Sequence, residues 1–174
     1  MKRYFLITLV AISSIAALAY SNLPSSVDKK SEVIEAGKEF ASPLESLDLV
    51  DAKGNKLDAS SLKGKNVFVN IWASWCMPCK LEMPGIQSLY GQTSRESSVF
   101  IMISVDESAA KALSYVQKKE YTVPVYFPSG PLPELLNVRS IPATFLFDRK
   151  GALVKTVEGM GYFNTQKYVD LLSK

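Results

Sequence analysis

Apolar runs separated by polar, turn-forming segments extend through most of the chain and predict its strands. Residues 66–72 (NVFVNIW) form an apolar run with β-branched and aromatic side chains, which is typical of a central strand buried on both faces. Shorter runs predict further strands over 99–105, 123–127, 143–147 and 152–157. We expect the last two to pair through the turn at 148–151, giving a terminal antiparallel hairpin.

Apolar residues at helical spacing predict the helices. They extend over 78–90, 108–119 and 164–172, with one brief helical segment over 131–137. Pro84 and Gly85 should kink or interrupt the first of these helices, because a proline inside a helix removes a backbone hydrogen bond. The order of strands and helices implies an α/β layer structure with a right-handed parallel crossover.

A small hairpin and a turn precede this core. Residues 47–50 and the residues around Leu57 flank the turn-forming sequence at 53–55, which predicts two short paired strands. The serine- and glycine-containing segment 60–64 then predicts a turn that leads into the central strand.

The N-terminus has the layout of an export signal. Lys2 and Arg3 precede an apolar stretch over 4–20 that lacks the amphipathic stripe of a core helix. Residues 17–19 (ALA) supply a signal-peptidase pattern, yet the run approaches the length of a membrane span, so cleavage and anchoring both stay open. In either case the rest of the chain is placed outside the cytoplasm. The predicted organisation is a signal peptide or membrane anchor over 1–20, a polar linker over 21–40 and one globular domain over 41–174.

Composition narrows the chemistry available to that domain. The 174 residues include two cysteines and no histidine. This excludes Ser-His-Asp and Cys-His catalysis and any histidine-ligated metal. Without Lys2 and Arg3 the chain has 18 basic and 17 acidic residues, and its basic pairs are scattered, whereas a nucleic-acid surface needs a concentrated basic stripe. We therefore expect carboxylates, lysines, thiols or water to carry protons, and we expect no nucleic-acid partner.

The two cysteines form a CxxC motif where the central strand ends and the first helix begins. Cys76 is expected at the helix N-terminus, where unpaired backbone N–H groups and the helix dipole favour the thiolate, the nucleophile of disulfide exchange. Cys79, one turn further on, is placed to attack the resulting mixed disulfide and release the reduced substrate. Pro78 suits the first helical turn and stiffens the ring that must close.

Two other uses of a CxxC pair fit less well. A zinc site needs four ligands, and the chain has neither a second CxxC pair nor a histidine to complete one. A purely structural disulfide between Cys76 and Cys79 would close almost no loop, so its entropic stabilisation would be small.

The sequence VFVNIWASWCMPCKLEMP, at 67–84, resembles the active-site strand and helix of the TlpA/ResA (DsbE-like) group of thiol-disulfide oxidoreductases. Residues 138–145 resemble the cis-proline segment of that group, and 147–151 resemble the turn that follows it. The similarity covers about 43–174. It implies a thioredoxin-like fold with an N-terminal β-hairpin and a central strand-helix insertion, which is too short for a DsbA-type helical domain.

The resemblance implies roles for residues beyond the cysteines. Pro142 would be cis, which places the backbone of Ile141 beside the sulfur atoms, where it can pair with an extended substrate segment. Trp75 and Pro78 complete the expected substrate-binding set. Glu82 matches the glutamate of the group's CxxCxxE pattern and would handle the proton of the resolving thiol. A solvated surface glutamate is the alternative at that position.

Three further positions bear on the site. Asn70 stands where cytosolic thioredoxins carry a buried aspartate, a departure that is typical of the TlpA/ResA group. Trp72 fits either the wall of the site or the core. Ala73 stands where a peroxiredoxin carries a threonine, three residues before its reactive cysteine, which argues against a peroxidase.

These features together predict an extracytoplasmic enzyme that reduces disulfides of exported proteins, in the periplasm or at the outer face of the inner membrane. The Cys76–Cys79 disulfide would be its only cofactor, and a membrane-embedded thiol reductase would be its electron donor. We expect a monomer that meets the membrane only through its N-terminal segment. An oxidase or isomerase stays open, as does a redox-inactive copper-binding or interaction module, which the missing histidine disfavours. The substrate also stays open, because apocytochrome c, an outer-envelope protein and a general disulfide pool all fit.

Overall fold

The computed structural model describes residues 42–173. The predicted signal or anchor over 1–20 and the linker over 21–40 therefore lie outside the described residues. Within 42–173, every helix is too short or too polar to cross a bilayer.

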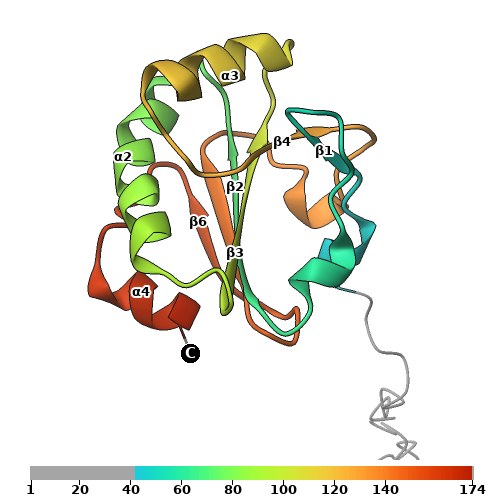
Figure 1. Cartoon of the computed structure of the whole chain (residues 1–174), viewed down its shortest axis with the longest axis vertical. Helices are drawn as coiled ribbons and strands as arrows, with labels where there is room; N and C mark the ends of the chain where they lie inside the picture. Colours follow the sequence, from blue (N-terminus) through green and yellow to red (C-terminus); the bar gives the residue numbers. More distant parts are fainter. Residues whose placement is uncertain (1–41, 174) are drawn as a thin grey trace, which may run out of the picture. The chain divides into compact units, whose positions relative to one another are not determined.

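A six-stranded mixed sheet forms the centre of the described domain, with the strand order β1-β4-β3-β2-β5-β6 (Figure 1). The strands are β1 (Leu49–Asp51), β2 (Asn66–Trp72), β3 (Ser98–Ser104), β4 (Val125–Pro128), β5 (Ala143–Phe147) and β6 (Leu153–Glu158). The pairs β2–β3 and β3–β4 are parallel, whereas β1–β4, β2–β5 and β5–β6 are antiparallel. The expected α/β architecture and its terminal antiparallel hairpin are confirmed.

The two faces of the sheet are covered by different kinds of element. The helices are α2 (Met77–Gln92), α3 (Ala109–Lys118) and α4 (Gln166–Ser173), and the 3-10 turns are η1 (Pro43–Ser46), η2 (Ala59–Leu62) and η3 (Glu134–Leu136). Phe68 and Trp72 of β2 belong to the hydrophobic cluster that contains the buried side chains of α2, α3 and α4. Val67, Val69 and Ile71 belong instead to the cluster that contains the buried leucines of the 3-10 turns. Figure 1 shows the helices on one side of the strands and the teal and orange turns on the other.

Strand β2 is the structural centre of the domain and ends at the redox motif. It spans the residues that the sequence predicts, and all seven of its side chains are buried. Because alternate side chains of a strand point to opposite faces, a strand between two neighbours and two covering layers must be apolar throughout, apart from polar groups with buried partners. Asn70 is such a group, and its partners are described below.

Helix α2 is continuous through Pro84 and Gly85, so the expected interruption is wrong. Pro84 lies on the exposed side of the helix, where water can satisfy the carbonyl that loses its backbone partner. The backbone of Phe163 and Asn164 lies next to Gly85, where a Cβ atom would be 3.6 Å from both backbone nitrogens, an ordinary van der Waals contact. Buried Met83 and Ile86 hold this part of the helix against the core.

The N-terminal hairpin is smaller than expected. Strand β1 takes β4 as its sheet partner, and the returning arm pairs with β1 as an isolated bridge between Val50 and Lys56 rather than as a strand. The turn expected over 60–64 is the 3-10 turn η2, and the helical segment expected over 131–137 is reduced to the single turn η3. Between Cys79 and Pro142, where the resemblance implies the strand-helix insertion, the chain after α2 forms β3, α3, β4 and η3.

Candidate active site

Cys76 and Cys79 form a disulfide at the N-terminus of α2, with an S–S distance of 2.05 Å and a Cα–Cα distance of 5.3 Å. Cys76 is the N-cap residue of the helix, and its Sγ accepts a hydrogen bond from the Cys79 backbone N–H at 3.2 Å. After reduction, the same donor and the helix dipole would stabilise a thiolate on Cys76. Cys79 lies in the first turn of α2 and is fully buried. Cys76, with a relative exposure of 5%, is therefore the outer of the two cysteines, and Cys79 is the inner one.

The loop between β2 and Cys76 is fixed by Asp106, a residue that the sequence analysis missed. Its carboxylate accepts hydrogen bonds from the Ser74 backbone N–H at 2.9 Å, the Ser74 hydroxyl at 2.7 Å and the Ser104 hydroxyl at 2.9 Å. These bonds join the end of β3 to the residue two before Cys76. The available signal was the sequence Ser104-Val105-Asp106 at the end of a parallel strand, where polar side chains of neighbouring strands meet.

The Ile141–Pro142 peptide bond is cis, as expected from the resemblance. The carbonyl oxygen of Ile141 lies 3.8 Å from Cys76 Sγ. Pro142 is buried, and its own carbonyl accepts a hydrogen bond from the Gly159 N–H at 2.9 Å. The structure thus brings Ile141 and the two cysteines together from positions that are 65 residues apart in sequence.

Glu82 is buried, with a relative exposure of only 3%, so the solvated alternative is wrong. Its Oε1 accepts a hydrogen bond from Asn70 Nδ2 at 2.8 Å, and its Oε2 accepts one from the Gly161 backbone N–H at 2.8 Å. Loss of hydration raises the pKa of Glu82 from 4.5 to about 7, although the two hydrogen bonds favour the carboxylate and oppose that shift. Glu82 can therefore exchange a proton near neutral pH.

Asn70 supports Glu82 from the neighbouring strand. Its side chain is fully buried, and besides Glu82 it donates to Thr144 Oγ1 at 2.9 Å. Thr144 is the residue of β5 that lies directly opposite Asn70 in the register. The sequence analysis identified Asn70 and Glu82 but missed Thr144 and Gly161, because both contacts depend on the pairing of distant segments.

Trp72 and Trp75 have different environments, which settles the alternative left open for Trp72. Trp72 is fully buried in the core cluster of the helical face, whereas Trp75 is 64% exposed beside Cys76. Pro78 is also exposed. Other large apolar side chains exposed near the motif or near Gly161 are Met77, Leu81, Val105, Met160 and Tyr162.

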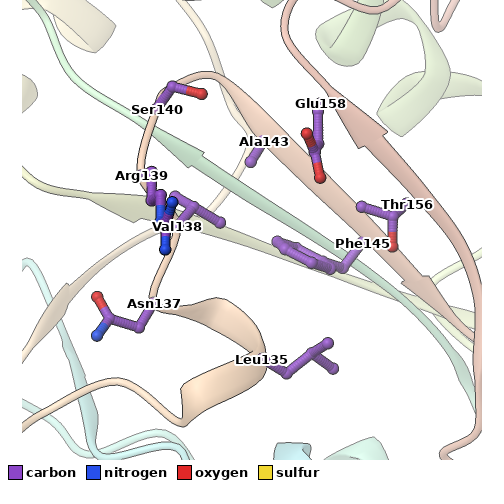
Figure 2. A pocket seen from close by; sticks show the side chains of 9 residues that line it. All are labelled: Leu135, Asn137, Val138, Arg139, Ser140, Ala143, Phe145, Thr156 and Glu158. Carbon is purple, nitrogen blue, oxygen red and sulfur yellow. The ribbon is translucent and has the colours of Figure 1, made fainter.

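A surface pocket of about 410 Å³ lies beside the cis-proline segment, between residues 137–140 and strands β5 and β6 (Figure 2). Two of its lining residues, Ala143 and Phe145, belong to the cluster on the face opposite α2. The pocket therefore lies across the sheet from Glu82. No group of three or more metal-ligating side chains occurs at this or any other place within 42–173.

Burial of Glu82 should make the oxidised protein less stable as the pH rises. Because the pKa is about 7 in the folded protein and 4.5 ordinarily, the folded state binds the Glu82 proton more tightly than the unfolded chain. This stabilising contribution is complete below pH 4.5 and is lost as the pH rises through 7. The free energy of unfolding should fall by about 3 kcal/mol over that range. Side-chain hydrogen bonds lower the pKa values of Asp48, Asp51 and Asp58, so these groups titrate below this window.

Urea unfolding at pH 5 and pH 8.5 measures this difference. Glu82→Gln cannot ionise and should show nearly equal stability at the two pH values. Equal stability of the unmodified protein at both pH values would contradict the protonation change assigned to Glu82.

Comparison with known proteins agrees with a thiol-disulfide oxidoreductase site. The AhpC/TSA family matches residues 38–156. The thiol-disulfide oxidoreductase ResA of Bacillus thuringiensis subsp. konkukian is 30% identical over 131 residues, which cover 75% of this chain and 73% of that protein. ResA of Bacillus subtilis is 30% identical over 159 residues, which cover 91% and 86% of the two chains.

A solved structure supports the thioredoxin-like fold. The thiol:disulfide interchange protein of Chlorobium tepidum TLS, described as a thioredoxin family protein, superimposes with a TM-score of 0.62 at 25% identity. The match covers 71% of this chain and 90% of that protein. The expected mixed α/β, thioredoxin-like fold is confirmed by this similarity.

Proposed function

Because this chain belongs to the ResA-like thiol-disulfide oxidoreductases of the AhpC/TSA family, we propose that it works as a reductant of disulfides in exported proteins. The observation that carries the proposal is the arrangement of the redox site. An outer sulfur at a helix N-terminus lies next to a buried sulfur, and a buried carboxyl group lies one helical turn further on. This arrangement supplies a nucleophile, a resolving thiol and a proton acceptor without histidine.

The reaction begins with the dithiol form. The Cys76 thiolate attacks one sulfur of a substrate disulfide, so a Cys76–substrate bond forms and the other substrate sulfur leaves as a thiolate, which takes up a proton. Cys79 then gives its proton to Glu82 and attacks Cys76 Sγ. The Cys76–Cys79 bond forms, the Cys76–substrate bond breaks, and the second substrate sulfur leaves with its electron pair. Two electrons have passed to the substrate, and the protein is left with its disulfide.

Glu82 is close enough to Cys79 for this role. Side chains three residues apart on a helix have Cβ atoms about 5–6 Å apart, so the longer glutamate side chain can come within hydrogen-bond distance of the thiol or be joined to it through one water molecule. Both side chains are buried. A proton released by Cys79 therefore has an acceptor at hand in a region that bulk solvent does not reach.

We assign substrate binding to Trp75, Pro78, Ile141 and Pro142. Ile141 is half-buried, and its carbonyl oxygen lies beside Cys76 Sγ, so an extended substrate segment that pairs with its backbone would bring a disulfide to Cys76. Trp75 and Pro78 are exposed and lie one residue before and two residues after Cys76 in the chain, so they can offer apolar contact to that segment.

The direction of electron transfer is argued from charge. An oxidant stabilises its reduced form by strongly lowering the pKa of the attacking thiol, which a cation between the two cysteines would do. Met77 and Pro78 occupy those positions and carry no charge. Glu82, when ionised, would oppose a thiolate on the same helix. The dithiol is then the less stabilised form, and the protein is the stronger electron donor.

The N-terminal sequence supports a location outside the cytoplasm, in the periplasm or at the outer face of the inner membrane. Lys2 and Arg3 before the apolar residues 4–20 have the layout of an export signal or anchor. A reductant in an oxidising compartment must be reduced again after each turnover. We propose a membrane-embedded thiol reductase as the electron donor, with the Cys76–Cys79 disulfide as the only cofactor of a monomeric protein.

The redox state in living cells tests the direction of transfer. Cells are quenched with acid, and free thiols are alkylated with a reagent that adds a visible mass for each cysteine. The protein should be found mainly as the dithiol, with both cysteines modified. A protein that carries mainly the Cys76–Cys79 disulfide in growing cells would favour an oxidase or isomerase.

A further inference from the structure

Three polar side chains are buried together on the helical side of the sheet. Asn70 of β2 and Thr144 of β5 are fully buried, and Glu82 of α2 is 3% exposed. Asn70 donates to both of the others, at 2.8 Å to Glu82 Oε1 and at 2.9 Å to Thr144 Oγ1. Their apolar surroundings include Phe68 and Trp72, which precede and follow Asn70 on the same face of β2. Burying polar groups among apolar side chains costs free energy, so their presence here calls for an explanation.

The orientation of the Asn70 carboxamide indicates that reason. Both hydrogen bonds use Nδ2, while the buried Oδ1 has no hydrogen-bond partner among the described residues. A buried acceptor without a partner lowers stability, so this orientation of the carboxamide carries a cost. It is the orientation that presents a donor to Glu82. Sites where a protein leaves such a cost in place are characteristically functional.

We propose that Asn70, oriented by Thr144, is a positioning residue that keeps the buried carboxyl group of Glu82 able to ionise and so to accept the proton of Cys79. The inference rests on the acid-base role proposed for Glu82. Without a donor on Oε1, burial would leave the carboxyl group protonated at neutral pH, and it could not act as a base. An aspartate at position 70 would have the opposite effect, because it offers no donor and its charge repels a second carboxylate.

The remaining contacts of Glu82 fit this assignment. The Gly161 N–H holds Oε2, and a Cβ atom on Gly161 would lie 2.3 Å from the Phe163 ring, so this close approach requires glycine. Glu82 has no ion pair within 42–173, and the titratable side chains nearest to it along α2 are the cysteines and Lys80. Asn70 and Gly161 are therefore the two groups that stabilise its ionised form.

Asn70→Leu, which keeps the branched shape of the side chain but removes the donor, tests the inference. The probe is a preformed mixed disulfide between Cys76 and a small chromogenic thiol, whose release by Cys79 is followed against pH. The rate should rise with pH through the pKa of Glu82. In Asn70→Leu the midpoint should move upward by about 1–2 pH units, because a hydrogen bond to the charged form is lost. A merely structural role would lower the rate equally at all pH values and leave the midpoint in place.

Thr144→Val and Thr144→Ser form a matched pair if Asn70→Leu does not fold. Valine removes the hydroxyl that orients the carboxamide and should move the midpoint upward, whereas serine keeps the hydroxyl and should retain the original midpoint. Equal midpoints in the valine and serine variants would overturn the inference.

A second background separates this inference from the proposed role of Glu82. In Glu82→Gln, adding Asn70→Leu should cause no further change in the pH profile. If Glu82→Gln alone leaves the profile unchanged, the acid-base role of Glu82 fails. If Glu82→Gln flattens the profile but Asn70→Leu leaves the midpoint unmoved, only the role of Asn70 fails.

Discussion

A Cys79→Ser variant should accumulate mixed disulfides between Cys76 and its substrate proteins. Cys76 caps α2 and accepts a hydrogen bond from the Cys79 N–H at 3.2 Å, whereas the Cys79 side chain is fully buried behind it. Attack therefore starts on Cys76, and without the second thiol the mixed disulfide cannot be resolved. Purified from cells, the variant should show covalent partners on a non-reducing gel that disappear when a reductant is added.

Cys76→Ser is the matched control for this experiment. It should lose exchange activity down to the uncatalysed background and trap few partners, because the buried Cys79 sulfur cannot reach a protein disulfide. The opposite pattern, with partners trapped on Cys79 and none on Cys76, would reverse the roles of the two cysteines.

Glu82→Gln should slow the resolving step about 100-fold at pH 7 and flatten its pH dependence around neutrality. The pKa of Glu82 is raised by burial to about 7, so the carboxylate fraction that can accept a proton grows as the pH rises through that value. Glutamine keeps the size of the side chain but accepts no proton at any pH studied. Stopped-flow measurement of thiol release from the Cys76 mixed disulfide, between pH 5 and pH 9, gives both quantities.

Glu107→Gln provides the control for removal of a carboxylate. Its side chain is 90% exposed and pairs only with Lys111, so this substitution should leave the rate and the pH profile unchanged. If Glu82→Gln and Glu107→Gln behave alike, Glu82 has no part in proton transfer.

The central strand and the redox motif could be predicted because their signals are local. Residues 66–72 carry an apolar run that only a doubly covered strand explains, and the structure gives the same bounds for β2. The spacing of Cys76 and Cys79 fits a single helical turn that begins where the strand ends. Neither conclusion requires knowledge of which distant segments pair.

The polar contacts behind the motif could not be predicted because they join distant segments. Asn70 and Thr144 are 74 positions apart, and Glu82 and Gly161 are 79 positions apart. Strand pairing brings Asn70 and Thr144 together, and the chain segment after β6 brings Gly161 to Glu82. In sequence, Thr144 is an ordinary strand threonine and Gly161 an ordinary loop glycine.

Helix α2 shows where a local rule fails for a physical reason. Pro84 and Gly85 both disfavour a helix, yet the helix runs through them. Their neighbours Met83 and Ile86 are buried, and the backbone of Phe163 and Asn164 packs next to Gly85. Tertiary packing thus outweighs helix propensity at this point, and packing is what a local pattern does not contain.

The reduction potential of the Cys76–Cys79 pair tests the proposed direction of electron transfer most directly. The purified domain is equilibrated with glutathione or dithiothreitol redox buffers, and its dithiol fraction is measured at pH 7. With no cation between the cysteines and with Glu82 on the same helix, the potential should lie near that of thioredoxin, about −270 mV. A value near that of DsbA, about −120 mV, would contradict a reductant and identify an oxidant.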